Sequence, residues 1–319
     1  MDNLNGGIDG SDPAPFKEQK PVMALDDHRE ELLTESERHL ALPERLFAME
    51  ELELLYQSSS QTLWTYMRPS GRPSFNLTML GNFYEWQQMI SDSFGPGKVP
   101  LRFVVLASRT PGVFSLGGDL ELFQSLIRNE DRQGLMNYGY RCVEILDRIM
   151  RGFALPITTI GLVQGSALGG GFEAVLAYDT IIAERDATFG LPEVIFGLFP
   201  GMGAHSILSR KLGSAVAERL ILSNQTYTAE QMHDLGIVHH LAEPGEGLQA
   251  CRDYIEKSQR RHSGLVHAHA AMRECTSIPL DEMKRIVAHW ADAALHLTEQ
   301  DLKMMSRLAR AQTRFSNAA

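Results

Sequence analysis

Two glutamates in glycine-rich and apolar surroundings are the residues of this chain best placed to do chemistry. Glu173 follows three consecutive glycines in SALGGGFEAV, and Glu193 follows Pro192 in a segment that has no other charge from Phe189 to Gly203. Glycines at a helix start let a ligand approach the backbone, and the free amides of the first turn stabilise negative charge. A carboxylate in that same turn lies near the atom beside the stabilised oxygen. The pattern indicates an oxyanion site with a general base.

Other interpretations of the glycine run compete with this one. A phosphate-binding P-loop needs Lys followed by Ser or Thr after the glycines, and Phe172 and Glu173 stand there instead. A dinucleotide fingerprint fits GxGxxA by letters, but it begins directly at a strand end, whereas five residues separate Val163 from Gly169. Taken on its own, Glu173 is better explained as an acid that stabilises the start of a helix through the helix dipole.

Two further observations favour the oxyanion site. In FSLGGDLELF, Gly117 and Gly118 precede Asp119, a suitable helix N-cap, so a second segment offers free amides. Two amides from two segments can hold one oxygen. Glu193 is costly to bury in its ionised form among apolar residues, so it requires a raised pKa, a function, or both.

Composition excludes several classes of protein. The 319 residues are 44% hydrophobic and 22% charged, as in globular proteins, and the net charge of −10 disfavours nucleic acid and anionic membrane surfaces as partners. No apolar run reaches the roughly 18 residues of a membrane span, and the first ten residues do not resemble a signal peptide, so we expect a cytoplasmic protein.

Metal and redox chemistry have no sequence support. The three cysteines Cys142, Cys251 and Cys275 are widely spaced, so we expect neither a disulfide framework nor a zinc site. The histidines at 205, 239 and 240 lack metal-ligand spacing with nearby acids. Ser166 does not lie in a GxSxG motif, so we assign it no nucleophilic role. We predict a site that uses no cofactor and no metal.

Segments with strand patterns alternate along the chain with segments with helix patterns, which predicts an α/β architecture with parallel strands. Strands are expected near residues 61–69, 101–108, 156–165 and 179–184, and one long helical region is expected at 120–150. The run at 101–108 is continuously apolar, which is typical of a strand covered on both faces. The predicted organisation is a disordered tail at 1–25, an N-terminal helical arm at 26–58 that Pro43 breaks in two, a catalytic core at 59–250 and a C-terminal helical region at 251–319.

From about residue 62 to 244 the chain resembles the crotonase superfamily, the enoyl-CoA hydratases and isomerases. The motifs FSLGGD, QGSALGGGFE, PE and GLFPGMG occur in the order and spacing of that family. The resemblance implies a spiral of ββα repeats with a helical C-terminal region, usually assembled as a trimer. It also implies that the amides of Gly118 and Gly170 hold a thioester carbonyl, and that Glu173 and Glu193 are catalytic. Two acids suit the addition or removal of water across a double bond.

Within the superfamily the chain looks most like the diffusible signal factor synthases. Gln164, Phe172 and the absence of a basic residue after Asp119 depart from ordinary hydratases. The likeness implies dehydration of a 3-hydroxyacyl group on acyl carrier protein to a cis-2-enoyl thioester, followed by hydrolysis that releases a fatty acid quorum-sensing signal. It implies an acyl tunnel, for which we predict Leu168, Gly169, Met202, Trp290 and Leu308.

An acidic carrier protein needs a basic docking surface, which leads to further predictions. The candidates lie on two expected helices and comprise Arg141, Arg148, Arg151, Lys303, Arg307, Arg310 and Arg314. Two other functions stay open at this point. One is an enoyl-CoA hydratase of fatty acid oxidation, and the other is a non-enzymatic acyl-binding protein that docks on a sensor.

Overall fold

Two sheets form the frame of the computed structural model, which describes residues 42–313. The larger sheet has the order β1-β2-β3-β5-β7-β10, and its strands are Leu52–Gln57, Thr62–Met67, Phe103–Ser108, Thr158–Val163, Thr180–Glu184 and His240–Ala242. The smaller sheet has the order β4-β6-β8-β9, and its strands are Gly112–Ser115, Gly165–Leu168, Thr188–Gly190 and Thr226–Thr228. All pairs in both sheets are parallel except β1 with β2 and β8 with β9.

A repeated unit links the two sheets. Each of β3, β5 and β7 is followed within a few residues by a short strand of the smaller sheet, and a helical segment comes next. These units are the turns of the ββα spiral that the family resemblance implied. They bring the ends of β4, β6 and β8 side by side, since these three strands are neighbours in the smaller sheet.

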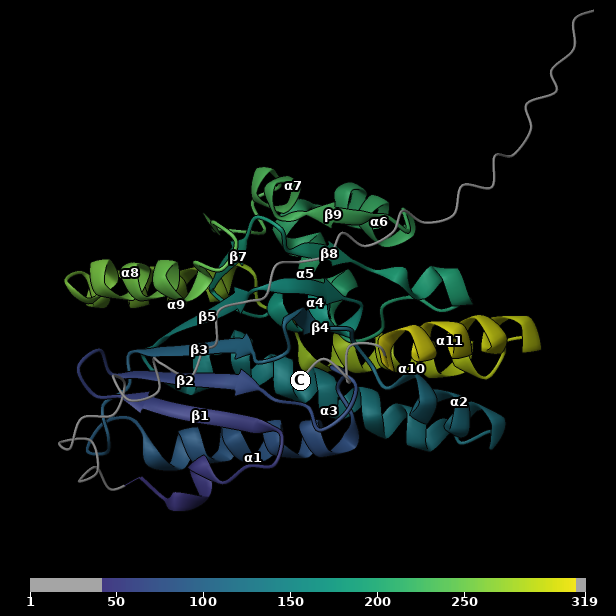
Figure 1. Cartoon of the computed structure of the whole chain (residues 1–319), viewed down its shortest axis with the longest axis horizontal. Helices are drawn as coiled ribbons and strands as arrows, with labels where there is room; N and C mark the ends of the chain where they lie inside the picture. The colour runs from purple at the N-terminus through teal and green to yellow at the C-terminus, as the bar shows by residue number, and fades with distance from the viewer. Residues whose placement is uncertain (1–41, 314–319) are drawn as a thin grey trace, which may run out of the picture.

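Helices cover both faces of the larger sheet (Figure 1). Their bounds are α1 Leu77–Ser93, α2 Leu120–Arg128, α3 Arg132–Met150, α4 Gly170–Val175, α5 Ala204–Leu212, α6 Ser214–Leu222, α7 Ala229–Asp234, α8 Gly247–Gln259, α9 His262–Cys275, α10 Leu280–Ala294 and α11 Glu299–Gln312. Within residues 42–313, 3-10 turns occur at η3 Glu44–Phe47, η4 Gly152–Ala154 and η5 Pro192–Phe196. In Figure 1, α2, α10 and α11 gather at one end of the molecule, and α8 lies at the other.

Alternate residues of the central strands enter two different cores. Val104 and Leu106 of β3 belong to the main core together with residues of α1 and α3. Phe103 and Val105, which point the other way, pack in a second cluster with Cys251 of α8. This two-sided burial confirms the prediction made from the apolar run at 101–108.

Two predicted elements differ in the structure. Residues 26–41 of the expected helical arm, like the expected tail at 1–25, lie outside the described residues, and the described part contains one 3-10 turn followed by strand β1. Buried and half-buried residues alternate along β1, which pairs with β2 in an antiparallel register starting at Leu52 and Met67. The expectation of a helix at residues 52–57 was therefore wrong. Pairing with β2 stabilises an extended strand, in which successive side chains alternate between the two faces of the sheet.

The helical region predicted at 120–150 is two helices. Between α2 and α3, Glu130 has a φ of 52°, and the carboxylate of Asp131 accepts a hydrogen bond from the Gly134 amide at 2.8 Å. This N-cap starts α3 in a new direction. None of the helices within residues 42–313 combines the length and apolarity needed to cross a membrane.

Candidate active site

The three consecutive glycines at 169–171 place the start of a helix against two neighbouring strands. Gly169, with a φ of 53°, follows the end of β6 and precedes α4, and its amide donates to the carbonyl of Gly190 in β8 at 2.8 Å. A Cβ added to Gly171 would lie 2.3 Å from the carbonyl oxygen of Ser115 in β4, so no larger residue fits there. The triplet is thus required by close backbone packing as well as by access for a ligand.

Two free backbone amides come together at this point. A Cβ added to Gly170 would lie 3.5 Å from the Gly118 amide nitrogen, and one added to Gly117 would lie 2.8 Å from the Gly170 amide nitrogen. Within residues 42–313 neither the Gly118 nor the Gly170 amide donates a hydrogen bond to another protein group. Two adjacent donors without partners have an arrangement that can stabilise one oxyanion.

Glu173 is a buried carboxylate with two backbone partners. The residue is 1% exposed, and its Oε1 accepts hydrogen bonds from the amides of Met202 at 2.9 Å and Ala204 at 3.0 Å. Burial raises the pKa of Glu173, whereas these two hydrogen bonds act in the opposite direction. The two hydrogen bonds therefore favour the ionised form of Glu173.

Glu193 lies in the turn η5, and its carboxyl group meets the glycine loop. A Cβ added to Gly169 would lie 2.6 Å from Glu193 Oε1, and Glu193 Oε2 is buried without a hydrogen-bond partner in the described structure. Burial raises the pKa of Glu193, and the charge of Glu173 raises it further. Of the two acids Glu193 is therefore the more easily protonated, because two hydrogen bonds stabilise the charge of Glu173.

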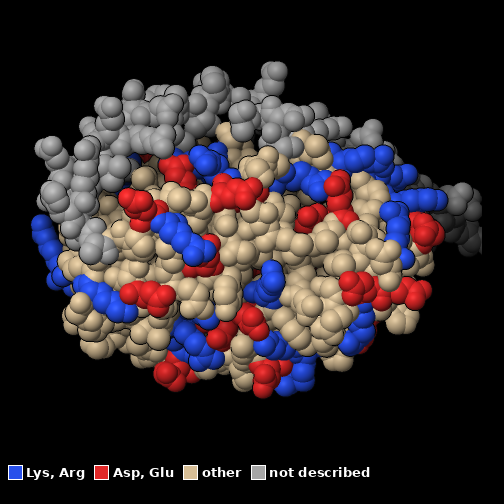
Figure 2. Space-filling model, turned by 90° about the horizontal axis from the view of Figure 1, so that it is seen from below, with Lys and Arg blue, Asp and Glu red and all other residues tan. Residues whose placement is uncertain are grey.

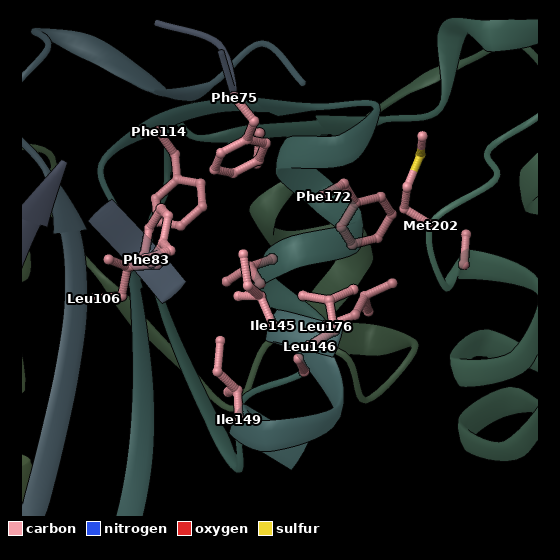
Figure 3. Close-up of a cluster of buried hydrophobic side chains, with 14 of the residues drawn as sticks. Phe75, Phe83, Leu106, Phe114, Ile145, Leu146, Ile149, Phe172, Leu176 and Met202 are labelled. Atoms are coloured by element: carbon pink, nitrogen blue, oxygen red, sulfur yellow. The ribbon is translucent and has the colours of Figure 1, made fainter. Parts of the chain in front are cut away.

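All nine site residues predicted from the sequence line one cavity of about 370 Å³. They are Glu173, Glu193, Gly118, Gly170, Leu168, Gly169, Met202, Trp290 and Leu308. The rest of the wall is mostly apolar, and Figure 3 shows part of it, with Phe83 and Leu106 on one side and Ile145, Leu146 and Ile149 of α3 nearby. Such a lining suits a hydrocarbon chain that leads away from the polar centre.

Sequence reasoning missed the contribution of α3 to this wall. Tyr138, Cys142, Ile145 and Ile149 line the cavity at intervals of three and four residues. That spacing is the mark of one helix face, so the signal was present in the sequence, but nothing in it showed which cavity the face covers. Trp290 of α10 closes another side, its ring centroid 5.1 Å from that of Phe123.

Ser166 and His205, which were also considered in the sequence, each make a hydrogen-bond contact with a nearby protein group. Ser166 shares a hydrogen bond with Thr188, 3.0 Å between the hydroxyl oxygens, and a ring nitrogen of His205 lies 3.0 Å from the carbonyl oxygen of Pro200. Among the described residues, no three His, Cys, Asp or Glu side chains are grouped so that they could hold a metal ion.

Comparison with known proteins shows the family to which the chain belongs. The family model described as enoyl-CoA hydratase/isomerase matches residues 97–313, and the chain belongs to this family. A probable mitochondrial enoyl-CoA hydratase 2 of Arabidopsis thaliana is 34% identical over 161 residues, which are 50% of this chain and 50% of that protein. A probable enoyl-CoA hydratase of Bacillus subtilis is 38% identical over 125 residues, 39% of this chain and 46% of that protein. The chain spans about half the length of these curated relatives.

Solved structures share the fold at lower identity. An enoyl-CoA hydratase from Bacillus halodurans aligns with a TM-score of 0.67 and 21% identity over 81% of this chain and 100% of that one. DspI of Pseudomonas aeruginosa aligns with a TM-score of 0.59 and 24% identity over 69% of this chain and 84% of that one. These likenesses confirm the expected crotonase fold.

Proposed function

We propose that this protein adds water to, or removes it from, carbons 2 and 3 of an acyl thioester. The proposal is carried by one observation: two carboxyl groups with raised pKa and two free amides from different loops border the same apolar cavity. The names of the curated relatives above support a hydratase, which favours this chemistry over an acyl-binding protein without activity.

The chain's own groups account for each proton in the hydration direction. The amides of Gly118 and Gly170 receive the charge that develops on the thioester oxygen as an enolate forms. Ionised Glu173 takes a proton from the water that bonds to carbon 3, and protonated Glu193 gives its proton to carbon 2. The pair holds one proton before and after, with its position exchanged. Dehydration is the same path reversed.

A second candidate is synthesis of a cis-2-unsaturated fatty acid signal, in which thioester hydrolysis follows dehydration. The amides that hold an enolate oxygen can also hold the tetrahedral oxyanion of hydrolysis. One observation favours this candidate. The family resemblance would place a basic residue just past Asp119, near the phosphates of CoA, whereas this chain has Glu121, which also engages the nearby guanidinium of Arg72 in an ion pair.

Basic residues on α11 suit an acidic acyl carrier protein. Lys303, Arg307 and Arg310 line a surface hollow beside α2, and none of the three forms an ion pair with a described acid. Figure 2 shows Lys and Arg along the upper edge at the end where α2 and α11 lie in Figure 1. Arg141 and Arg148 of α3 likewise form no ion pair with a described acid, whereas Arg151, just past the end of α3, pairs with Asp147. Arg314 lies outside the described residues. Docking on a sensor and a trimeric state remain predictions from the resemblance.

One assay tests both candidates. The protein is incubated with 3-hydroxydodecanoyl-CoA and with 3-hydroxydodecanoyl acyl carrier protein, and 2-enoyl thioester and free fatty acid are measured by mass spectrometry. We expect dehydration of at least one carrier form, because the two acids and two amides suffice for it. Free unsaturated acid from the carrier-protein substrate would establish the second candidate, and reversible hydration without free acid would exclude it. No turnover of either substrate would refute the proposal.

The shared proton predicts a bell-shaped pH profile for kcat/KM. Acidification adds a second proton to the pair and removes the base, and alkalinisation removes the last proton and with it the acid. Burial raises both pKa values above the ordinary 4.5, so both limbs lie at higher pH than for exposed carboxylates and the maximum lies near neutrality. Rates measured from about pH 5 to 10 check this. A plateau across the alkaline range would contradict a proton on the pair.

A further inference from the structure

Gln312 brings a polar group to the cavity that the proposed reaction does not use. It lies at the last position of α11, one turn beyond Leu308, and both residues line the cavity. Its Nε2 donates a hydrogen bond to the carbonyl oxygen of Leu116 at 3.1 Å. Its Oε1 is buried and has no hydrogen-bond partner within residues 42–313. The side chain is thus held in place by one end and offers an unused acceptor at the other.

The unused acceptor of Gln312 lies near the Gly118 amide, one of the two donors proposed to hold the thioester oxygen. Leu116 precedes the oxyanion donor Gly118 by two residues, a length of chain that spans at most about 7 Å. With the hydrogen bond to Leu116 added, the Gln312 carboxamide lies on the order of 10 Å from that donor. A buried acceptor without a partner is unfavourable unless a ligand supplies the donor.

Two donors exist on the thioesters considered above. One is the 3-hydroxyl group, which must lie against Glu173 and Glu193 for water to be exchanged. The other is the amide N–H of the cysteamine arm, which is separated from the thioester sulfur by two carbons in both CoA and acyl carrier protein. The carbonyl held at Gly118 and Gly170 places the sulfur, and hence this arm, within reach of the Leu116–Gly118 loop. The second donor therefore fits Gln312.

We propose that Gln312 binds the cysteamine N–H of the substrate and so sets the position of the arm relative to the oxyanion donors. This inference rests on the proposed thioester substrate and names a binding residue for it. It makes α11 part of the substrate site and not only its cover. Because both carriers contain this arm, the contact does not distinguish CoA from acyl carrier protein.

The test combines one substitution with one atom exchanged in the substrate. The 3-hydroxydodecanoyl thioester of N-acetylcysteamine is compared with an analogue in which an ester oxygen replaces the N–H. For the wild-type protein we expect the analogue to raise KM about tenfold with little change in kcat. In Gln312→Met, which keeps the length of the side chain and lacks the acceptor, we expect the two substrates to differ less than about twofold.

Ser306→Ala is the matched control on the same helix. Ser306 donates to Gln124 Oε1 at 2.5 Å and so ties α11 to α2, but it does not line the cavity. We expect this variant to keep the tenfold preference for the N–H substrate. If Ser306→Ala lost the preference to the same extent as Gln312→Met, the effect would come from the attachment of α11, and the proposed contact would be wrong.

A binding measurement separates this inference from the proposed function. Saturated ketone analogues that have CH₂ in place of sulfur and no 3-hydroxyl group, made with and without the N–H, have no water to lose and no double bond to hydrate. They bind without reacting, and calorimetry gives their dissociation constants. An N–H preference present in the wild type and absent from Gln312→Met supports the contact even if no thioester is turned over. Equal affinity of the wild type for both analogues overturns it, whatever the turnover.

Discussion

Glu173→Gln and Glu193→Gln are each expected to lower kcat for hydration and dehydration by about 10³-fold. The amide is similar in shape, and its oxygen at position 173 can still accept the hydrogen bonds from Met202 and Ala204. The glutamine side chain can neither accept nor donate the proton that is transferred in the reaction. Steady-state rates on a 2-enoyl and a 3-hydroxyacyl thioester measure the loss.

Stability distinguishes this catalytic role from a structural one. Burial raises the pKa of both acids, so replacing either with a neutral amide should leave the Tm unchanged or raise it. Glu184→Gln is a suitable control, because Glu184 is also a buried acid but lies outside the cavity, where it accepts hydrogen bonds from Gln164 and the Gly247 amide. We expect that variant to lose stability and keep its kcat. A normal rate in Glu173→Gln would disprove the assignment.

Gly117→Ala is expected to lower kcat by about 10²- to 10³-fold while both glutamates stay in place. The added Cβ would lie 2.8 Å from the Gly170 amide nitrogen and 2.9 Å from the Leu168 carbonyl oxygen, and both are backbone atoms that cannot turn aside. The φ of 91° adds strain for any residue with a Cβ. The two loops must separate, and the amides of Gly118 and Gly170 then no longer point at one oxygen.

Gly81→Ala provides the comparison for this substitution. Gly81 is exposed on α1, and a Cβ there would meet nothing within 4 Å. We expect an unchanged kcat and a gain in unfolding free energy of about 0.5–1 kcal/mol from helix propensity. Urea denaturation gives the folded fraction of each variant, so that rates are compared per folded molecule. A folded Gly117→Ala protein with the wild-type kcat would show that the two loops do not form the oxyanion site.

Local sequence patterns predicted the elements that are long and strongly apolar. β3, β5 and β7 were expected at nearly their observed positions, because each is a short run rich in β-branched and other apolar residues that is buried on both faces. Local patterns did not predict the smaller sheet, since β4, β6 and β8 have three or four residues and show no readable period; only the family resemblance, through its ββα repeats, implied a second strand in each unit. Yet these short strands place the Gly118 and Gly170 loops side by side.

What the sequence determined by itself was the chemistry available: two acids in apolar segments and two glycine-flanked helix starts, each readable within about ten residues. Only the tertiary structure decided that they meet in one cavity, that α3 and α11 close it and that Glu193 lacks a partner for one oxygen. The physical reason is that pKa values and free hydrogen-bonding groups depend on what surrounds a residue in space. At Glu173 those surroundings come from residues 29 and 31 positions away.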